Sequence, residues 1–530
     1  MAAAPKVFVR DATGLTREAS GLDVFVYNTL NQNVGIGALF VLGFLGLYSG
    51  VSPYLAIALT VAATIPVAAV YGMLSSAMPR SGGDYVFVSR ILTPGLGFFT
   101  SFNWLFWLLV YIGVPAGFLP QYGVAPLLRV LAVVTGSRGV LQLAGSVESP
   151  VGIIVVGTVL MAVFTYVFVR GVRLYMRIQN IAFLLAMVNA LLMIAVLFST
   201  PHAAFVSRFD RYVVAAGGKA GAYAAIMHAY GTHAAGFSLG NTLLFSSWVI
   251  LIIAFSVTST MIGGEVKSAR RSQFYGMTTP IVFTGIVMAL LAAAVFHTAG
   301  LRFVEASGSV APSTYGLGFV PYYQELAAIA AGPGWLGVVM MVLFLFWTYV
   351  WLPVNFLAST RILLAWSIDR LIPDRVADVH PRLHAPTVAI AIVAVLGEVS
   401  LILYAVGILS LLSGIFTWLL SFMIAAVAAL VFPYRRPELY RGSPFQGRLL
   451  GVPVITWVGA VALVALVYME AILWLDPVQG LGANNPTSAI MRWVSGALIV
   501  AAVVAYQVIK AARRRSGIDV TAAFVEIPPE

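Results

Sequence analysis

The sequence predicts an all-α polytopic membrane protein with 12 transmembrane helices, and three observations support this. Of the 530 residues, 61% are hydrophobic and only 9% are charged, whereas soluble proteins carry about 25% charged residues. Twelve apolar segments are each long enough to cross a bilayer at about 1.5 Å per residue. The first of them carries three amides and two glycines near its middle, which predicts a break in that helix.

The apolar segments place the spans in order along the chain. We expect them at about residues 24–47, 52–77, 97–127, 150–169, 178–200, 242–264, 277–299, 335–360, 386–406, 408–432, 452–475 and 489–510. An even number of spans puts both termini on one side of the membrane. Two long loops, about 201–241 and 300–334, lie on the other side, where we expect short helices that cover an outer vestibule.

The distribution of charge predicts the orientation. Every Lys and Arg lies on the side of the N-terminus except Arg129, Arg138, Arg208, Arg211, Lys219, Arg302 and Arg492. Because cytoplasmic loops carry the excess of Lys and Arg, we expect a multi-pass protein of the cell membrane with both termini in the cytoplasm. The polar segment 1–23 contains no apolar core before a cleavage site, so we expect no signal peptide, and residues 511–530 form a cytoplasmic tail.

The composition also excludes several classes of function. The net charge of +11 reflects topology and attraction to anionic lipid, so we expect no nucleic-acid partner. The chain has no cysteine, which excludes thiol chemistry. His228 and His233 are five residues apart, a spacing that does not place two ligands on one helix face, so we expect no metal site there. No motif predicts an enzyme.

The segment 31–37, Asn-Gln-Asn-Val-Gly-Ile-Gly, interrupts the first span. Glycine favours leaving the helix, and the freed backbone groups then need partners other than lipid. Broken helices of this kind line cavities and bind ions or polar ligands at their ends. The alternative is a packing face, since small residues let two helices approach closely.

Two halves of similar length predict an inverted repeat. Residues 24–200 and 242–432 each hold five spans, so the second half begins from the opposite side of the membrane. The spans in 452–510 lie outside the repeat. A break in span 1 then predicts a break in span 6, where the small polar segment 256–260 (Ser-Val-Thr-Ser-Thr) follows apolar sequence. The alternative is that these hydroxyls bond back to their own helix.

Four motifs resemble those of amino acid permeases in the amino acid–polyamine–organocation superfamily, whose fold is leucine-transporter-like. They are PRSGGDYVFVSR at 79–90, GEVKSARR at 264–271, RILLAWSIDRLIP at 361–373 and VGIG at 34–37. The resemblance covers about residues 20–510. It implies a secondary active transporter that works by alternating access in the lipid bilayer. Symport, exchange and uniport all stay open, as do a monomer and a homodimer, and we expect no cofactor.

The resemblance implies substrate contacts at both breaks. Backbone N–H groups after the span 1 break would hold a carboxylate, and carbonyls of the span 6 break would hold an ammonium group, with Phe255 as a lid. The candidate substrate-binding residues are Asn33, Val34, Gly35, Ile36, Gly37, Ala38, Ile253, Ala254, Phe255, Ser256 and Thr258. Gln32 and Asn33 either contact the ligand or satisfy freed backbone groups. Aromatic residues that can line the pocket are Trp104, Trp107, Trp347, Tyr349, Trp351 and Trp418.

The resemblance also implies a site for a coupling ion. Span 5 has Ala186 where sodium-independent relatives carry a lysine. Adjacent hydroxyls suit a hard cation, and the possible sodium site comprises Asn31, Val34, Phe356, Ser359 and Thr360. The alternatives are hydroxyls that bond back to the helix or coupling to H⁺, for which Glu398 and Glu470 are deep carboxylates. Asp84 and Glu265 are candidates for an inner gate.

The predicted substrate is an amino acid or a related amine. Span 6 lacks the glycine-aromatic-glycine pattern of many relatives, and Ala269 stands where many have proline. Two alternatives therefore stay open: the same fold carrying another solute, such as a nucleobase, a polyamine or an inorganic ion, and an ion channel.

Overall fold

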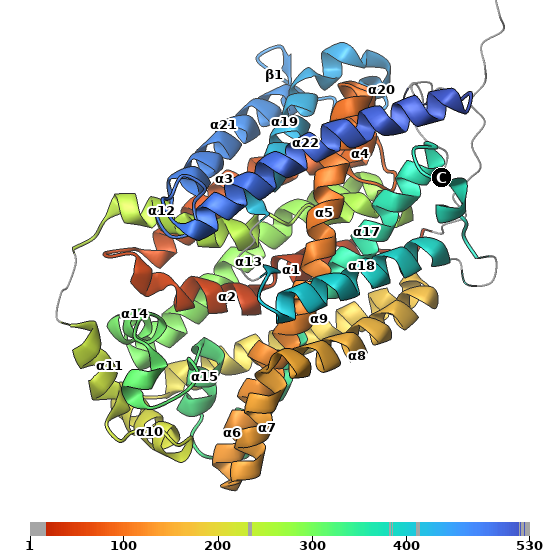
Figure 1. Cartoon of the computed structure of the whole chain (residues 1–530). Helices are drawn as coiled ribbons and strands as arrows, with labels where there is room; N and C mark the ends of the chain where they lie inside the picture. The colour runs from red at the N-terminus through yellow and green to blue at the C-terminus, as the bar shows by residue number, and fades with distance from the viewer. Residues whose placement is uncertain are drawn as a thin grey trace, which may run out of the picture.

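The structure is a computed structural model, which describes residues 17–231, 236–380, 383, 385–409, 414–518, 520 and 524. Within these residues it contains 12 helical segments that are long and apolar enough to cross a membrane. The predicted all-α polytopic fold is confirmed. Figure 1 shows the helices gathered into one bundle, with a group of shorter helices at one end.

Two of the first five spans, spans 1 and 3, consist of more than one helical segment. The five spans are α1 (Gly21–Gln32) with α2 (Val34–Gly43) and η1 (Leu45–Leu47), α3 (Pro53–Ala77), α5 (Pro94–Phe118) with η2 (Leu119–Val124) and α6 (Ala125–Thr135), α8 (Pro150–Val169), and α9 (Val172–Ser199).

The other seven spans follow with two further breaks. They are α12 (Leu239–Ile253) with η3 (Thr258–Met261), α13 (Ala269–Ala299), α16 (Trp335–Thr348) with α17 (Trp351–Ile368), α18 (Thr387–Ala405), α19 (Ile415–Arg435), α21 (Val454–Leu475) and α22 (Pro486–Arg515). The predicted breaks in spans 1 and 6 are present. The break between α16 and α17 in span 8 was not predicted.

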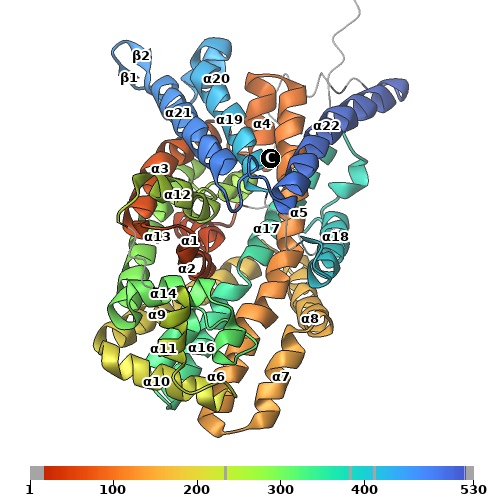
Figure 2. The same ribbon diagram turned by 60° about the vertical axis from the view of Figure 1, so that its left-hand side comes forward.

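Short elements connect the spans at both ends of the bundle. At the end that holds the chain termini lie α4 (Asp84–Ile91), η4 (Gly263–Glu265), η6 (Asp374–Val376), α20 (Pro437–Arg441) and the antiparallel strands β1 (Arg448–Leu449) and β2 (Val452–Pro453). At the other end lie α7 (Arg138–Glu148), α10 (His202–Ala215), α11 (Ala222–Tyr230), α14 (Leu301–Ser309), η5 (Pro312–Tyr315) and α15 (Tyr323–Ala330). Figure 2 shows the two groups at opposite ends. The short helices expected in the two long loops are confirmed.

Several helices run further than their apolar segments. Span 3 continues to Thr135, span 7 begins at Ala269 and span 8 ends at Ile368, each eight residues beyond the predicted limit. Hydropathy marks where lipid is crossed, whereas a helix continues wherever its backbone hydrogen bonds can be made. The start predicted for span 10, at 408, runs into residues 410–413, which lie outside the described residues. So do His233 and most of the N-terminal segment.

A buried charge cluster holds the group of short helices together. Arg129 on α6 donates to Glu325 on α15 at 2.9 and 3.1 Å, and to Glu148 on α7 at 2.7 Å. Tyr212 on α10 donates to Glu325 at 3.2 Å. Since Arg129 and Glu325 are 3% and 0% exposed, removing either partner would leave an uncompensated buried charge. Four helices are therefore fixed to one another at the end of span 3.

The central part of the bundle places span 1 among spans 6, 7 and 8. Helix α1 packs on α13, α9 and α17, and α5 packs on α17 and α18. This arrangement puts the breaks of spans 1, 6 and 8 in one region. The division into repeats at 24–200 and 242–432 stays a prediction.

Candidate functional site

Span 1 breaks at the single residue Asn33. Its backbone is left-handed, with φ 49° and ψ 70°, a conformation that asparagine tolerates better than most residues. Its N–H donates to the carbonyl of Thr29 at 3.1 Å, and its carbonyl accepts from the N–H of Gly37 at 2.8 Å. Its Oδ1 accepts from the N–H of Ile36 at 3.2 Å. Asn33 therefore ends α1 and caps α2, and its Nδ2 is buried without a partner among the described residues.

The two glycines of this segment are required by close packing. A Cβ added to Gly35 would lie 2.3 Å from Cγ of Trp347, and one added to Gly37 would lie 2.7 Å from Cγ2 of Ile252. Tyr323 also donates a 2.9 Å hydrogen bond to the carbonyl of Gly35. The glycines thus serve helix packing, as the alternative reading of the sequence proposed, while Asn33 makes the break.

Amides of span 1 satisfy the backbone that the span 6 break sets free. The side chain of Gln32 donates to the carbonyl of Ile253 at 2.9 Å. The side chain of Asn31 donates to the carbonyl of Phe255 at 3.0 Å, and also to the hydroxyl of Thr258. The two predicted breaks therefore lie against each other, and Gln32 serves the backbone.

A further amide joins the two breaks on the side of the chain termini. Asn28 donates to Oγ of Ser259 at 2.8 Å and accepts from the N–H of Ser259 at 3.0 Å. The same side chain donates to the carbonyl of Gly276 on span 7 at 2.7 Å. Span 7 holds the same segment, since Ser259 donates to Oε1 of Gln273 at 2.8 Å and Gln273 donates to the carbonyl of Ser259 at 3.0 Å. Ser256 donates to the carbonyl of Met277, also on span 7, at 2.5 Å.

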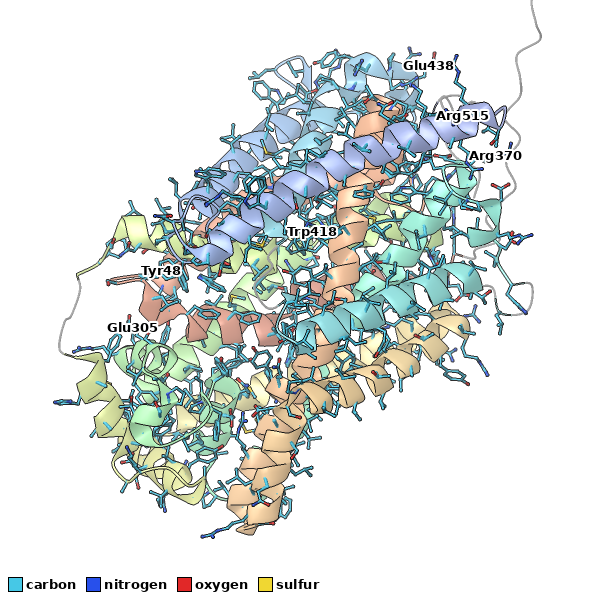
Figure 3. The ribbon with its side chains drawn as sticks, viewed as in Figure 1. Tyr48, Glu305, Arg370, Trp418, Glu438 and Arg515 are labelled. Atoms are coloured by element: carbon cyan, nitrogen blue, oxygen red, sulfur yellow. The ribbon has the colours of Figure 1, made fainter. Side chains whose placement is uncertain are left out.

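A small aromatic cavity of about 20 Å³ lies beside the breaks. It is lined by Asn31, Trp104, Tyr111, Leu251, Phe255, Trp351, Asn355 and Trp418. Figure 3 places Trp418 near the middle of the bundle. A cavity of this size holds about one water molecule, so any larger ligand requires these side chains to move.

Proline explains how spans 3 and 8 meet at this cavity. Pro115 has no N–H and its ring crowds the carbonyl of residue 111, and Tyr111 accordingly has the non-helical ψ of 22°. The carbonyl of Tyr111 instead accepts a 2.6 Å hydrogen bond from Asn355 on α17. In span 8, Trp351 follows the break and its indole N–H donates to the carbonyl of Asn31.

Only some of the sequence candidates line this cavity. Asn31, Phe255, Trp104, Trp351 and Trp418 do so, whereas residues 33–38 and Ile253, Ala254, Ser256 and Thr258 are buried beside it. Of the other aromatic candidates, Trp107 donates to Thr417 and Trp347 donates to the carbonyl of Ala186. Sequence reasoning missed Tyr111, Leu251 and Asn355. Pro115, four residues after Tyr111, was a usable signal for the first of these.

The hydroxyls of the possible sodium site bond back to their own helix. Ser359 donates to the carbonyl of Asn355 at 2.8 Å, and Thr360 donates to that of Leu357 at 2.7 Å. Nη1 of Arg361 lies 3.1 Å from Oγ1 of Thr360. The carbonyl of Asn31 is occupied by Trp351. Phe356 stacks on Phe168, and Val34 is buried at the start of α2.

The two acids predicted as an inner gate have separate partners. Glu265 forms a two-point ion pair with Arg361, at 2.6 and 2.9 Å, that joins the end of span 6 to span 8. Asp84 accepts from Trp104 at 3.0 Å and from Tyr71 at 3.3 Å. Of the other predicted acids, Glu398 accepts from Thr158, while both oxygens of Glu470 are buried without a partner among the described residues.

A cluster of side chains lies on spans 1 and 6 at their ends away from the chain termini. Phe44 stacks on Trp248 with ring centroids 4.1 Å apart. Tyr48 accepts from the indole N–H of Trp248 at 3.0 Å and donates to Asp476 at 2.7 Å. Ser247 also donates to Asp476. Contacts among spans 1, 6 and 8 and the loop after α21 thus lie toward both ends of the bundle from the central cavity.

A family model described as amino acid permease matches residues 24–503. This range contains both breaks, the aromatic cavity and the buried ion pair between Glu265 and Arg361. No curated protein matches the chain.

Proposed function

This chain belongs to the amino acid permease family, and we propose that it is a secondary active transporter of amino acids or related amines that works by alternating access. The observation that carries the proposal is the contact between the breaks of spans 1 and 6 through Asn31 and Gln32. Two interrupted helices that meet in the middle of a membrane protein present helix ends and free backbone groups to a ligand.

The start of α2 is the proposed carboxylate site. The first N–H groups of a helix have no partner within it and carry a partial positive charge. Asn33 takes up the N–H groups of Ile36 and Gly37, so those of Val34 and Gly35 are the donors left for a ligand. The buried Nδ2 of Asn33 adds a third donor. Anions bind readily at such a helix end.

The unwound segment of span 6 and the aromatic cavity form the proposed site for the ammonium group and side chain. The carbonyls of Ile253 and Phe255 are taken by span 1 amides, which leaves those of Ala254 and Ser256 for a ligand. Phe255 is part of the cavity wall. Aromatic walls suit both an apolar side chain and a cation.

Alternating access requires that the two closures open in turn. On the side of the chain termini, which we propose is cytoplasmic, the pair Glu265–Arg361 is the candidate gate. On the other side, the cluster of Phe44, Trp248 and Tyr48 is the candidate gate. The structure then corresponds to a state closed on both sides.

The coupling ion is a separate proposal. The hydroxyls of Ser359 and Thr360 donate to carbonyls of their own helix, and the carbonyl of Asn31 accepts from Trp351, whereas a hard cation needs several oxygen ligands. We therefore favour H⁺ over Na⁺.

Uptake by proteoliposomes tests the proposed function. The purified protein is reconstituted, and uptake of a labelled amino acid mixture is measured with sodium and pH gradients imposed separately, against protein-free liposomes. We expect uptake that saturates with concentration and does not require sodium. Absence of amino acid uptake under every gradient would contradict the proposed substrate class, and a requirement for sodium would restore the site at Thr360.

A further inference from the structure

Asp84, the first residue of α4, is a buried carboxyl group without a cationic partner. The residue is 0% exposed. Its Oδ2 accepts hydrogen bonds from the indole N–H of Trp104 and the hydroxyl of Tyr71, and its Oδ1 has no partner among the described residues. A buried carboxylate is normally paired with a cation, so this site favours a bound proton.

No described cation forms an ion pair with Asp84. Helix α4 packs on α3, α5 and α19. Arg90 on α4 is paired with Asp369 at 2.7 Å, and Arg361 at the same end of the bundle is paired with Glu265 at 2.6 Å. Arg435 is exposed at the end of α19. The ionisable side chains on these elements are Tyr54 and Tyr71 on α3, Tyr85 and Arg90 on α4, Tyr111 on α5, and Tyr434 and Arg435 at the end of α19.

The protonation of Asp84 is balanced near neutral pH. Burial raises the pKa of Asp84 from 3.8 to about 7, while the hydrogen bonds from Trp104 and Tyr71 lower it. Both forms of the carboxyl group are therefore populated under physiological conditions. A neighbouring charge that favours one form therefore causes the carboxyl group of Asp84 to take up or release a proton.

Trp104 lies between Asp84 and the aromatic cavity. Its indole N–H donates to Asp84, while its ring lines the cavity and packs edge-on against Phe255 and Trp418, at 6.4 and 5.4 Å between centroids. The lining contains five aromatic rings and no charged side chain. Aromatic faces attract cations, and an ionised Asp84 behind one of these faces adds to that attraction.

We propose that Asp84 is a proton-binding site whose protonation opposes the binding of a cationic group in the aromatic cavity. The inference rests on the proposed function, which places the substrate in that cavity. A cation there stabilises the carboxylate across a water-poor wall, so its binding releases the proton to solvent. Protonation of Asp84 removes the same attraction. The substrate is then a solute with an ammonium group, exchanged for a proton that moves in the opposite direction.

Infrared difference spectra between about pH 5 and pH 9 test the proton site without a substrate. The C=O stretching band of a protonated carboxyl group is measured in the wild type and in the Asp84→Asn, Glu398→Gln and Glu470→Gln variants. We expect a band that titrates near neutral pH and is absent only from Asp84→Asn. A neutral-range band that Asp84→Asn retains, or that Glu470→Gln loses, would overturn the proposal.

Two probes test the link to the cavity. Choline is cationic, and 3,3-dimethylbutan-1-ol is its neutral analogue. We expect choline, and not the alcohol, to move the midpoint of the Asp84 band at least about one unit to lower pH, a roughly tenfold change in proton affinity. We expect Trp104→Phe, which keeps a ring but removes the hydrogen-bond donor, to move the midpoint of the band to higher pH. This variant replaces Asp84→Asn as the test of the assignment if Asp84→Asn does not fold. Equal effects of both probes would overturn the link.

Uptake measurements separate the two proposals. We expect an acidic interior to stimulate uptake of the labelled amino acid mixture severalfold in the wild type and in Glu398→Gln, and to have no effect in Asp84→Asn. Uptake that proceeds with no titrating Asp84 band would overturn this inference and leave the transporter intact. A titrating, choline-sensitive band without amino acid uptake would support the proton site and contradict the amino acid substrate.

Discussion

Asn355 donates a 2.6 Å hydrogen bond to the backbone carbonyl of Tyr111. Pro115, four residues further along the chain, has no N–H to donate to this carbonyl. This contact joins spans 3 and 8 at the wall of the aromatic cavity. A proline in the sequence thus creates both the kink and the acceptor that the partner helix uses.

The first prediction concerns this contact. Asn355→Leu keeps the side-chain size but removes the hydrogen bond to the Tyr111 carbonyl, which costs about 1 kcal/mol. Pro115→Ala restores the helical N–H donor, so the double variant is less destabilised than the sum of the single variants. Unfolding midpoints of the four proteins in detergent measure this coupling, and strict additivity would show that the two residues act independently.

The second prediction concerns the buried ion pair of Glu265 and Arg361. Glu265→Gln removes one charge and leaves Arg361 buried without its counter-ion, which destabilises the closed state. The natural chain has no cysteine, so Leu251→Cys provides a single reporter in the cavity wall. We expect Glu265→Gln to increase labelling of this cysteine by a membrane-impermeant thiol reagent roughly tenfold, a shift of about 1.4 kcal/mol.

The side of the membrane from which the thiol reagent reaches the cysteine shows whether one gate has opened. Labelling should increase only from the side of the chain termini, because Phe44 and Trp248 still cover the other side. An equal increase from both sides would indicate general loosening of the fold instead of an opened gate.

The third prediction concerns Gly37. Its Cα faces Ile252 on α12, and an added Cβ would lie 2.7 Å from that side chain. We expect Gly37→Ala to reduce uptake at least about tenfold by separating the two broken spans, and Ile252→Ala to restore part of it. Gly145→Ala on α7, where nothing lies within 4 Å of an added Cβ, is the control. Full uptake by Gly37→Ala would remove close packing of spans 1 and 6 from the mechanism.

The fourth prediction concerns stability and pH. The pKa of Asp84 is raised to about 7 by burial in the folded protein and is about 3.9 in an unfolded chain. The folded state therefore binds more protons between these values, and its stability decreases as pH rises from about 4 to 7. We expect Asp84→Asn, which cannot ionise, to lose this part of the pH dependence in thermal unfolding. An identical pH profile in both proteins would contradict the assignment.

The sequence was sufficient for the architecture and insufficient for the details of the cavity. The lengths of the apolar segments predicted the twelve spans, and residues 31–37 predicted the first break, because both features depend on local sequence alone. The cavity wall depends on contacts between distant segments: Leu251 and Asn355 look like ordinary positions of apolar helices until span 3 bends at Tyr111 toward them. The hydroxyls of Ser359 and Thr360 fit either a cation or a helix carbonyl by sequence alone, and in the structure both donate to carbonyls of their own helix.

Binding by Asn33→Asp, compared with Asn485→Asp, tests the central claim most directly. Both residues cap a helix through the side-chain oxygen, a role that aspartate also fills. Only Asn33→Asp places a negative charge at the proposed carboxylate site.

The measurement is saturation binding of the labelled amino acid mixture to the purified protein. We expect Asn33→Asp to weaken binding at least about a hundredfold, close to 2.7 kcal/mol, and Asn485→Asp to bind as the wild type does. Unchanged binding by a folded Asn33→Asp variant would show that the substrate carboxylate does not lie at the start of α2.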